Sequence, residues 1–240
     1  MPLRDLADRR NVLHRKSDPQ TILAHALEDV QIGPVALVSS FGAESVVLLH
    51  LAAQVRPDVP VIFLDTEMLF AETLAYQEQI ARDLGLTDLR RITPDRAALF
   101  ERDNEGVLHL HDTDACCTLR KTEPLERALS GFGGWITGRK RFQGGARAEL
   151  PHYEKSGPRI KVNPLAQWSR DDLVAYMDRH DLPRHPLVAQ GYPSIGCMPC
   201  TSRVSAGEDP RAGRWRGQDK AECGIHFENG KVVRKKEQAA

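Results

Sequence analysis

The sequence predicts an α/β fold with a doubly wound, mostly parallel sheet. Short apolar runs rich in β-branched residues alternate with segments whose apolar residues recur at helical spacing. The first runs lie at 35–41, 59–66 and 89–94, and the helical segments between them lie at 44–55 and 69–85. Such alternation is typical of parallel strands joined by right-handed crossover helices.

Later segments continue the pattern. We expect an acidic loop after the third run, then a helix over 117–129 and strands at 134–138 and 159–165. Ser169 is placed to cap a helix over 170–180. From Leu182 onward prolines and glycines are frequent, and we predict no regular structure there.

The chain divides into three predicted parts. Residues 1–33 form a helical lead-in, because apolar residues in 20–30 recur at helical intervals. Residues 34–205 form the α/β domain, and residues 206–240 form a flexible basic C-terminal tail.

Composition excludes several classes of protein. The 240 residues carry 33 basic and 33 acidic side chains, so the overall charge favours neither nucleic acid nor a membrane as partner. No apolar run approaches the ~20 residues of a membrane span, and the N-terminus lacks the apolar region of a signal peptide. We therefore expect a cytoplasmic protein, in which the five cysteines stay reduced and indicate metal or redox chemistry.

Four of the cysteines form two pairs. Cys116 and Cys117 are adjacent, and their Cα atoms, ~3.8 Å apart, are too close for an ordinary disulfide. Cys197 and Cys200 form a C-x-x-C, which is metal-ligand spacing. Either pair alone is equally consistent with buried thiols. Together they favour an iron–sulfur cluster over zinc, because adjacent thiolates converge poorly on one small ion but can bind separate irons.

The fifth cysteine, Cys223, stands alone in the stretch "ECGIH". An isolated cysteine is usually a spare surface thiol. His226 and Lys220 lie close by in the sequence, however, and positive charge lowers the pKa of a thiol. The polar segment around Gly224 therefore predicts a nucleophile on a mobile arm.

The loop from Ser39 to Ser45 joins the first strand to its helix. Its hydroxyls, Gly42 and a helix N-terminus together favour an anion, although a plain capped turn explains them equally well. Asp65 and Thr66 end the second strand at the same edge of the sheet, where doubly wound folds bind ligands; a simple N-cap is the alternative.

A basic loop follows the strand at 134–138. Its cations indicate either a clamp on a phosphate or sulfate, or an ordinary exposed loop. They are Arg139, Lys140, Arg141 and Arg147.

Six stretches now combine in one order: "SSFGAES", "FLDTEMLFAET", "CCTLRKTEPL", "TGRKRFQGGAR", "GCMPCT" and "ECGIH". In these stretches, from about Val35 to Phe227, the chain resembles the assimilatory adenylyl-sulfate reductases, relatives of the phosphoadenylyl-sulfate reductases. The paired cysteines, the C-x-x-C and the terminal E-C-G-I-H form the most specific part of the match.

The resemblance implies a fold of the adenine-nucleotide α-hydrolase type, like that of ATP pyrophosphatases. It implies a [4Fe–4S] cluster on Cys116, Cys117, Cys197 and Cys200. The implied catalytic residues are Cys223 as nucleophile, Lys121 and His226. The residues implied around the phosphosulfate are Arg139, Arg141, Arg211 and Arg214, and those on the adenosine side are Ser39, Ser40, Gly42, Asp65 and Thr66.

The reaction implied is the reduction of adenylyl sulfate to sulfite and AMP through an S-sulfocysteine on Cys223, in sulfate assimilation and cysteine biosynthesis. Thioredoxin or glutaredoxin would supply the electrons; no redox domain follows the core, so we expect a separate reductant. Phe41 and Glu44 replace the first glycine and the aspartate of the pyrophosphatase loop S-G-G-x-D-S. We therefore do not expect ATP cleavage.

Three alternatives stay open. A phosphoadenylyl-sulfate reductase or a dual-substrate enzyme is the nearest, although all four cluster cysteines favour adenylyl sulfate. A tRNA-thiolating enzyme would need an intact S-G-G-x-D-S loop and a broader basic surface. A zinc-stabilised nucleotide binder leaves Cys223 without a role. The sequence does not fix the oligomeric state, and a homo-oligomer stays open.

Overall fold

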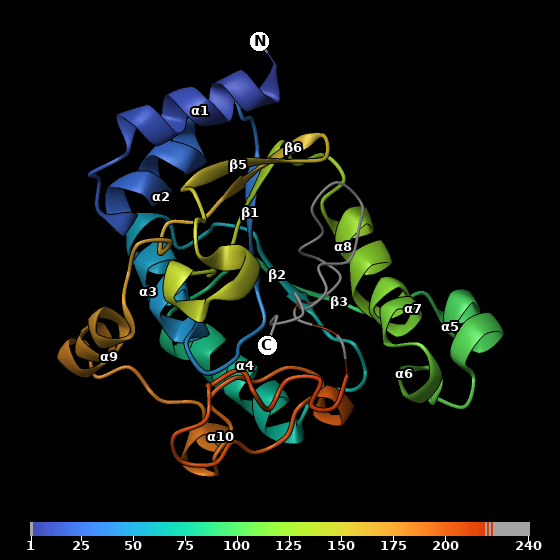
Figure 1. Cartoon of the computed structure of the whole chain (residues 1–240). Helices are drawn as coiled ribbons and strands as arrows, with labels where there is room; N and C mark the ends of the chain where they lie inside the picture. Colours follow the sequence, from blue (N-terminus) through green and yellow to red (C-terminus); the bar gives the residue numbers. More distant parts are fainter. Residues whose placement is uncertain (1, 219, 221, 223–240) are drawn as a thin grey trace, which may run out of the picture.

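A computed structural model describes residues 2–218, 220 and 222. Its centre is a six-stranded sheet in the order β3-β2-β1-β4-β6-β5 (Figure 1). The strands are β1 (Val35–Ser39), β2 (Val61–Leu64), β3 (Leu89–Ile92), β4 (Gly134–Ile136), β5 (Tyr153–Ser156) and β6 (Arg159–Val162). All neighbours pair in parallel except β5 and β6, so the predicted mostly parallel sheet is confirmed.

Helices surround the sheet. The α-helices are α1 (Leu3–Leu13), α2 (Pro19–Glu28), α3 (Ser45–Val55), α4 (Ala71–Asp83), α5 (Arg96–Asp103), α6 (Leu108–His111), α7 (Thr113–Cys117), α8 (Glu123–Ala128), α9 (Arg170–Arg179) and α10 (Pro186–Ala189). A π-helical turn, η1 (Thr118–Thr122), joins α7 to α8. The 3-10 turns are η2 (Arg141–Gln143), η3 (Gly145–Arg147) and η4 (Met198–Cys200).

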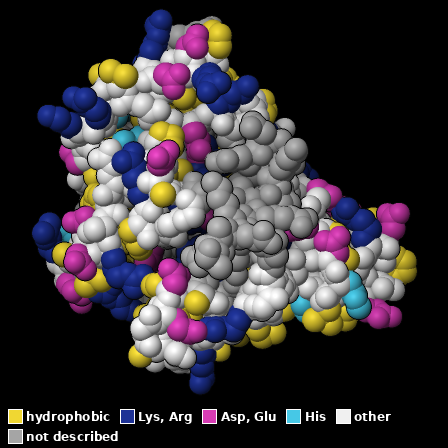
Figure 2. All heavy atoms as spheres, viewed as in Figure 1, with side chains coloured by type: hydrophobic (Ala, Val, Ile, Leu, Met, Phe, Trp, Pro, Cys, Tyr) yellow, Lys and Arg dark blue, Asp and Glu magenta, His cyan; other side chains and the backbone are white. Residues whose placement is uncertain are grey.

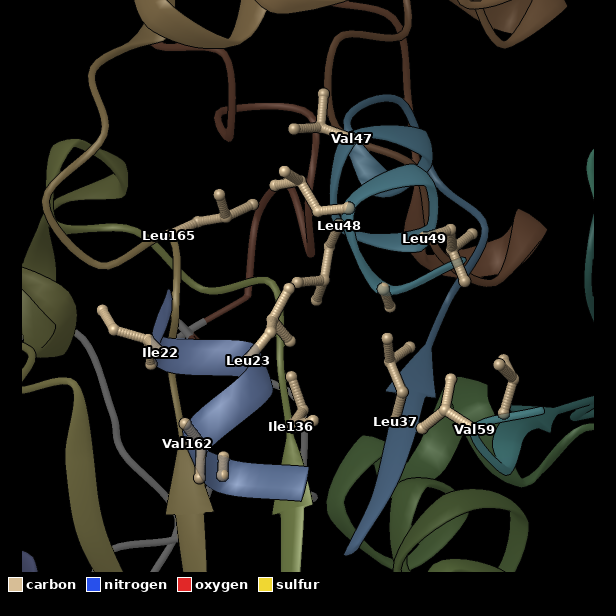
Figure 3. Packing of buried hydrophobic residues seen from close by; sticks show 14 of the residues in the cluster. Ile22, Leu23, Leu37, Val47, Leu48, Leu49, Val59, Ile136, Val162 and Leu165 are labelled. Carbon is tan, nitrogen blue, oxygen red and sulfur yellow. The ribbon is translucent and has the colours of Figure 1, made fainter. Parts of the chain in front are cut away.

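Alternate residues of the strands face opposite layers of helices. Leu37 belongs to the larger apolar cluster, which includes residues of α2, α3, α4 and α9, whereas Ala36 and Val38 belong to a second cluster with residues of α8. Figure 1 shows α2 and α3 on one side of the sheet and α8 on the other. In Figure 3, Leu23 of α2 and Leu48 of α3 lie above the strands that carry Ile136 and Leu37. This double covering explains why the central strands are continuously apolar.

The sheet has a topological switch point beside β1. From β1 the chain builds β2 and β3 on one side, and then returns to build β4 and β6 on the other. Loops that leave the carboxyl ends of β1 and β4 therefore diverge, which leaves a crevice between them. This crevice holds the site described below.

Close packing at the start of β4 requires glycine. A Cβ atom on Gly133 would lie 1.8 Å from the carbonyl oxygen of Ile32, a backbone atom that cannot move aside. The backbone N–H of Gly133 donates to the carbonyl of Pro34 at 2.9 Å. The glycine therefore lets the lead-in to β1 lie directly against β4.

The acidic loop predicted before residue 117 is wrong, because this segment forms α5, α6 and α7. Asp95 accepts a hydrogen bond from the N–H of Ala98 at 2.9 Å, and Asp112 accepts one from the N–H of Ala115 at 2.9 Å. These acidic residues are helix N-caps and not loop residues. The predicted single helix over 117–129 is also interrupted by η1.

Two other regions differ from expectation. β5 was not predicted, because it is a short, largely polar edge strand that pairs antiparallel with β6 through a turn at Gly157. α10 and η4 lie in the segment after Leu182 for which no regular structure was predicted. The division into 1–33, 34–205 and 206–240 stays a prediction. A bridge between Thr201 and Arg214 joins its last two parts.

The surface of the described residues is mixed in charge. Figure 2 shows acidic and basic side chains interspersed over the visible face, in keeping with the balanced composition. In the part of the chain that the structure describes, no helix is long and apolar enough to cross a membrane.

His185 is buried at the start of α10 and both of its ring nitrogens are bonded. The N–H of Leu187 donates to Nδ1 at 3.2 Å, so Nε2 carries the proton and donates to the hydroxyl of Thr73 at 3.1 Å. A second proton on Nδ1 would face the N–H of Leu187. Burial lowers the pKa of His185 from 6.5 to about 4, and Glu72 opposes this only in part.

We predict that replacing His185 by Asn reduces the amount by which the free energy of unfolding falls on acidification. Between the folded and unfolded pKa values the unfolded chain binds a proton that the folded chain does not, so the free energy of unfolding falls as pH falls through this window, by up to about 3 kcal/mol. Urea unfolding at about pH 7.5 and about pH 5 measures the difference. His185→Asn keeps an acceptor for Leu187 and should lose less stability on acidification than the wild type. Equal losses in both proteins would contradict the prediction.

Candidate functional site

A cavity of about 240 Å³ lies at the carboxyl ends of β1 and β4. Ser39 and Ser40 line it from the end of β1, and Thr137 to Arg139 line it from the end of β4. Thr66, which follows β2, contributes to the same wall. The cavity therefore occupies the switch point of the sheet, where doubly wound folds bind their ligands.

The loop after β1 is held open by its own hydrogen bonds. The N–H of Gly42 donates to the hydroxyl of Ser45 at 2.9 Å, and the N–H of Phe41 donates to the hydroxyl of Ser39 at 3.2 Å. Phe41 has φ of 47°, which is unfavourable for an L-residue, but its ring is fully buried against Phe63. Burial of this ring fixes the loop, so the crevice above β1 is preformed.

Cations line the opposite wall of the cavity. Arg139, Lys140, Arg147 and Arg214 are buried, and the side chain of Arg211 is 20% exposed. Several have acidic partners: Lys140 pairs with Glu44 at 2.6 Å, and Arg139 pairs with Glu154. Burial and the nearby Arg147 lower the pKa of Arg211 to about 10, so its guanidinium stays charged at neutral pH. The wall can bind an anion, because several guanidinium groups and an ammonium group lie together there and guanidinium groups match phosphate and sulfate geometry.

A second, smaller cavity contains all four paired cysteines. Its lining residues are Met68, His109, Thr113, Cys116, Cys117, Arg120, Lys121, Cys197, Cys200 and Trp215. Cys116 and Cys117 end α7, and Cys197 and Cys200 flank the η4 turn. The Sγ of Cys197 lies 3.2 Å from the hydroxyl of Thr66, and its backbone pairs with Leu69. Residues eighty positions apart in the sequence thus meet around one space.

The charges around these thiols suit a metal-bound group. Burial, with smaller contributions from Cys197 and Cys200, raises the pKa of Cys116 to about 11 against the opposing effect of Arg120. Burial also raises the pKa of Cys200, with a contribution from Cys197. Clustered thiols of this kind become thiolates only beside positive charge, which metal binding supplies. Among the residues described, no three His, Cys, Asp or Glu side chains form a group that could hold a single metal ion.

Lys121 and Trp215 line both cavities, so the two spaces share a wall. The guanidinium of Arg214 lies 4.4 Å above the Trp215 ring. The indole Nε1 of Trp215 is buried and has no hydrogen-bond partner among the described atoms. A buried N–H normally has a hydrogen-bond acceptor. A sulfur atom of a cluster bound in the cysteine cavity would provide an acceptor for the indole N–H of Trp215.

The structure brings together most of the predicted site residues. Those lining the larger cavity are Ser39, Ser40, Gly42, Thr66, Lys121, Arg139, Arg211 and Arg214. Asp65 and Arg141 are not among the described residues that line it. Asp65 accepts from the Nε of Arg91 at 2.8 Å, and the Nε of Arg141 donates to the carbonyl of Leu150 at 2.8 Å. The contact of Asp65 is to another side chain, and that of Arg141 is to the backbone. Cys223 and His226 lie outside the described residues.

Sequence reasoning missed two residues of the shared wall and the cavity. Trp215 gives no motif signal, although it directly follows the predicted Arg214. Glu222 was seen only as a letter of the terminal motif, yet its side chain lines the larger cavity. Spacing alone cannot reveal either role, because both depend on contacts made across the fold.

Comparison with known proteins agrees with this geometry. Residues 34–203 match the phosphoadenosine phosphosulfate reductase domain. This chain belongs to the phosphoadenosine phosphosulfate reductase family. One relative in the family is an adenosine 5′-phosphosulfate reductase of Mesorhizobium japonicum, 49% identical over 90% of this chain and 85% of its own. Another, of a Chelativorans species and of the same name, is 53% identical over 81% of this chain and 80% of its own.

Solved structures support the same family and fold. The phosphoadenylyl-sulfate reductase of Candida auris, solved as a phosphate complex, superposes with a TM-score of 0.68 at 26% identity, over 82% of this chain and 96% of its own. An FMN adenylyltransferase of Candida glabrata superposes with a TM-score of 0.55 at 15% identity, over 80% of this chain and 66% of its own. The second likeness concerns the fold alone.

We predict that replacing Gly196 by Ala weakens anion binding. The added Cβ would lie 2.3 Å from a terminal nitrogen of Arg214, so the guanidinium must leave its place above Trp215. Loss of a charged donor typically costs ~1.5–3 kcal/mol, so affinity should fall roughly tenfold to a hundredfold. Calorimetric titration with inorganic phosphate measures the change.

A double variant distinguishes displacement of the Arg214 guanidinium from a general disturbance of the fold. If Gly196→Ala acts through Arg214, then adding it to Arg214→Gln should change the affinity for phosphate little further, because both changes remove the same contact. Unchanged affinity in Gly196→Ala alone would show that Arg214 does not bind the anion.

Proposed function

We propose that this chain is an adenylyl-sulfate reductase, which converts adenylyl sulfate and a reduced dithiol to sulfite, AMP and a disulfide. The observation that carries the proposal is the shared wall of Lys121 and Trp215, which sets a cavity rich in cations beside four clustered cysteines. Relatives named adenosine 5′-phosphosulfate reductase, 49% and 53% identical to this chain, support the substrate.

The adenosine would lie at the carboxyl edge of β1. The loop from Ser39 to Ser45 offers hydroxyls and an open backbone there, and Thr66 adds a wall. The phosphosulfate would point toward Arg139, Arg211 and Arg214, with its sulfate near Lys121. This orientation places the reacting sulfur close to the shared wall.

We propose that Cys116, Cys117, Cys197 and Cys200 hold a [4Fe–4S] cluster. The set fits such a group, because the four thiols line one cavity and Arg120, Lys121 and Lys220 surround it. When bound, the cluster would shape the wall of the substrate cavity and tune the local charge at Lys121. The electrons for the reaction come from thiols, so the residues that bind and transfer the sulfo group carry the chemistry.

The first step is transfer of the sulfo group to the protein. The thiolate of Cys223 attacks the sulfur of adenylyl sulfate, the bond from sulfur to the bridging oxygen breaks, and AMP leaves with that electron pair. Cys223 then carries an S-sulfocysteine. A phosphate leaving group needs little acid assistance, and His226 is proposed to assist near the thiol. The main barrier is the repulsion between two anions, which fixed cations offset; one well-placed donor is typically worth ~3–4 kcal/mol.

The second step releases sulfite. A thiolate of thioredoxin or glutaredoxin attacks the Sγ of Cys223 and expels sulfite with the electron pair of the sulfur–sulfur bond. The second thiol of the donor then resolves the mixed disulfide, so the dithiol is oxidised by two electrons. This chemistry requires a compartment that keeps thiols reduced, and we propose the cytoplasm.

Metal analysis tests the cysteine cavity. Protein purified without oxygen should be brown and contain about four irons and four sulfides per chain. Replacing Cys200 by Ser should remove most of the iron, because a hydroxyl is a poor ligand for this group. Colourless protein with one zinc per chain would overturn the cluster proposal.

Replacing Cys223 by Ser tests the reaction itself. The variant should release no sulfite above background from adenylyl sulfate and thioredoxin, because a serine hydroxyl is not ionised at neutral pH. Its visible spectrum should match that of the wild type, since Cys223 is not a proposed cluster ligand. Sulfite release by this variant would show that another group is the nucleophile.

The same assay with phosphoadenylyl sulfate addresses the nearest alternative. We expect faster sulfite release from adenylyl sulfate, because Lys140, a buried cation of the cavity, is already paired with Glu44. An added 3′-phosphate would need a cation of its own. Faster release from phosphoadenylyl sulfate would assign the alternative activity.

A further inference from the structure

We propose that Asn163 is the positioning residue for Arg139, and that it orients this guanidinium toward the phosphate of the bound nucleotide. Asn163 directly follows β6 and is not among the described residues that line the larger cavity. The inference rests on the proposed function, because it concerns a cation that we expect to bind the phosphosulfate. It assigns a role to a side chain that lies behind the wall of the site.

The amide oxygen of Asn163 accepts hydrogen bonds from two residues that follow β4. The hydroxyl of Thr137 donates to Oδ1 at 2.8 Å, and a terminal nitrogen of Arg139 donates to it at 3.2 Å. The hydroxyl of Thr137 in turn accepts from the backbone N–H and from the Nε of Arg139, both at 3.4 Å. Thr137 and Asn163 together therefore hold Arg139 by its backbone and by its guanidinium.

The amide of Asn163 cannot reverse, because its nitrogen has acceptors of its own. Nδ2 donates to the carbonyl of Pro151 at 3.0 Å and to the carboxylate of Glu154 at 3.2 Å. A reversed amide would place its oxygen against these two acceptors, and its N–H groups against the N–H group of Arg139. The contacts of Nδ2 therefore fix the direction of Oδ1 toward Arg139.

The backbone of Asn163 is held as closely as its side chain. Its N–H donates to the carbonyl of His152 at 2.7 Å, and its carbonyl accepts from the ring Nδ1 of His152 at 3.0 Å. The parallel pairing of β4 with β6 brings the residue beside Thr137, whose N–H donates to the carbonyl of Val162 at 2.8 Å. Asn163 is fully buried. It is therefore a rigid support of the kind that keeps a binding group in one orientation.

An amide oxygen orients a guanidinium without adding a negative charge to it. Glu154 also pairs with Arg139, but its carboxylate accepts from Nδ2 of Asn163 and lies 3.9 Å from the ammonium of Lys161. The charge of Glu154 is therefore shared with Lys161 and does not act on Arg139 alone. Arg139 is held in place while its positive charge is only partly offset, so an anion in the cavity is still attracted to it.

The binding of AMP and of adenosine tests this role, because the two ligands differ only in the phosphate. Calorimetric titration of protein purified without oxygen measures both affinities. Asn163→Leu keeps a similar volume and removes the amide. We expect this variant to bind AMP roughly tenfold more weakly and to bind adenosine as the wild type does. A general disturbance of the fold would weaken both ligands and leave the ratio of their affinities unchanged.

Asn11→Leu is the matched control. Asn11 also forms two side-chain hydrogen bonds at β5, donating to the carbonyl of Tyr153 at 2.7 Å and accepting from its N–H at 2.8 Å. Its described contacts do not include Arg139, so this variant should keep the wild-type ratio. Thr137→Val removes the hydroxyl between Asn163 and Arg139 and keeps the side-chain shape. It should lower the ratio, and it decides the question if Asn163→Leu does not fold.

A double variant tests whether Asn163 acts through Arg139. Arg139→Gln should also weaken the binding of AMP and leave that of adenosine unchanged. Adding Asn163→Leu to Arg139→Gln should change the affinity for AMP little further, because both changes act on the same guanidinium. If the two losses simply add, Asn163 does not act through Arg139 and the proposal is wrong.

The outcomes distinguish this role from the proposed function. A wild-type protein that prefers AMP, with the same ratio in Asn163→Leu and Thr137→Val, would overturn the role of Asn163 and leave the reductase proposal intact. Equal weakening of AMP and adenosine in Asn163→Leu would also overturn it, because it would indicate a general structural role. A wild-type protein that binds AMP no more tightly than adenosine would contradict both the role of Asn163 and the proposed placement of the substrate.

Discussion

The parallel pairing of β1 with β4 is the constraint on which both cavities depend. It places two strands side by side whose following loops turn in opposite directions, so that a crevice opens at their carboxyl ends. The pairing requires the lead-in to β1 to approach β4 closely, which Gly133 permits. The Ser39–Ser45 loop and the basic loop after β4 then face each other as a consequence of topology.

Charge is the second constraint on the site, because four of the cations that line the larger cavity are buried. A buried cation is costly unless it is paired, and several partners here come from distant segments: Glu44 for Lys140, Glu154 for Arg139 and Asp103 for Arg120. The pairing of Arg120 with Asp103 also joins the η1 turn to α5, and Arg120 donates to the carbonyl of Thr66 at 2.9 Å. Arg120 thus connects the segment that follows Cys116 and Cys117 to the end of β2. This contact joins elements that line the two cavities.

The sequence predicted the central strands and the larger helices because their apolar residues are continuous or periodic. It also singled out the four cysteines that line one cavity and several residues that line the other, because these residue types are uncommon in such patterns. The prediction failed where the same residue type, Asp, is common both in loops and at helix N-caps. Asp95 and Asp112 looked like loop residues but cap helices. Trp215 and Glu222 could not be assigned, since their surroundings are assembled only by the fold.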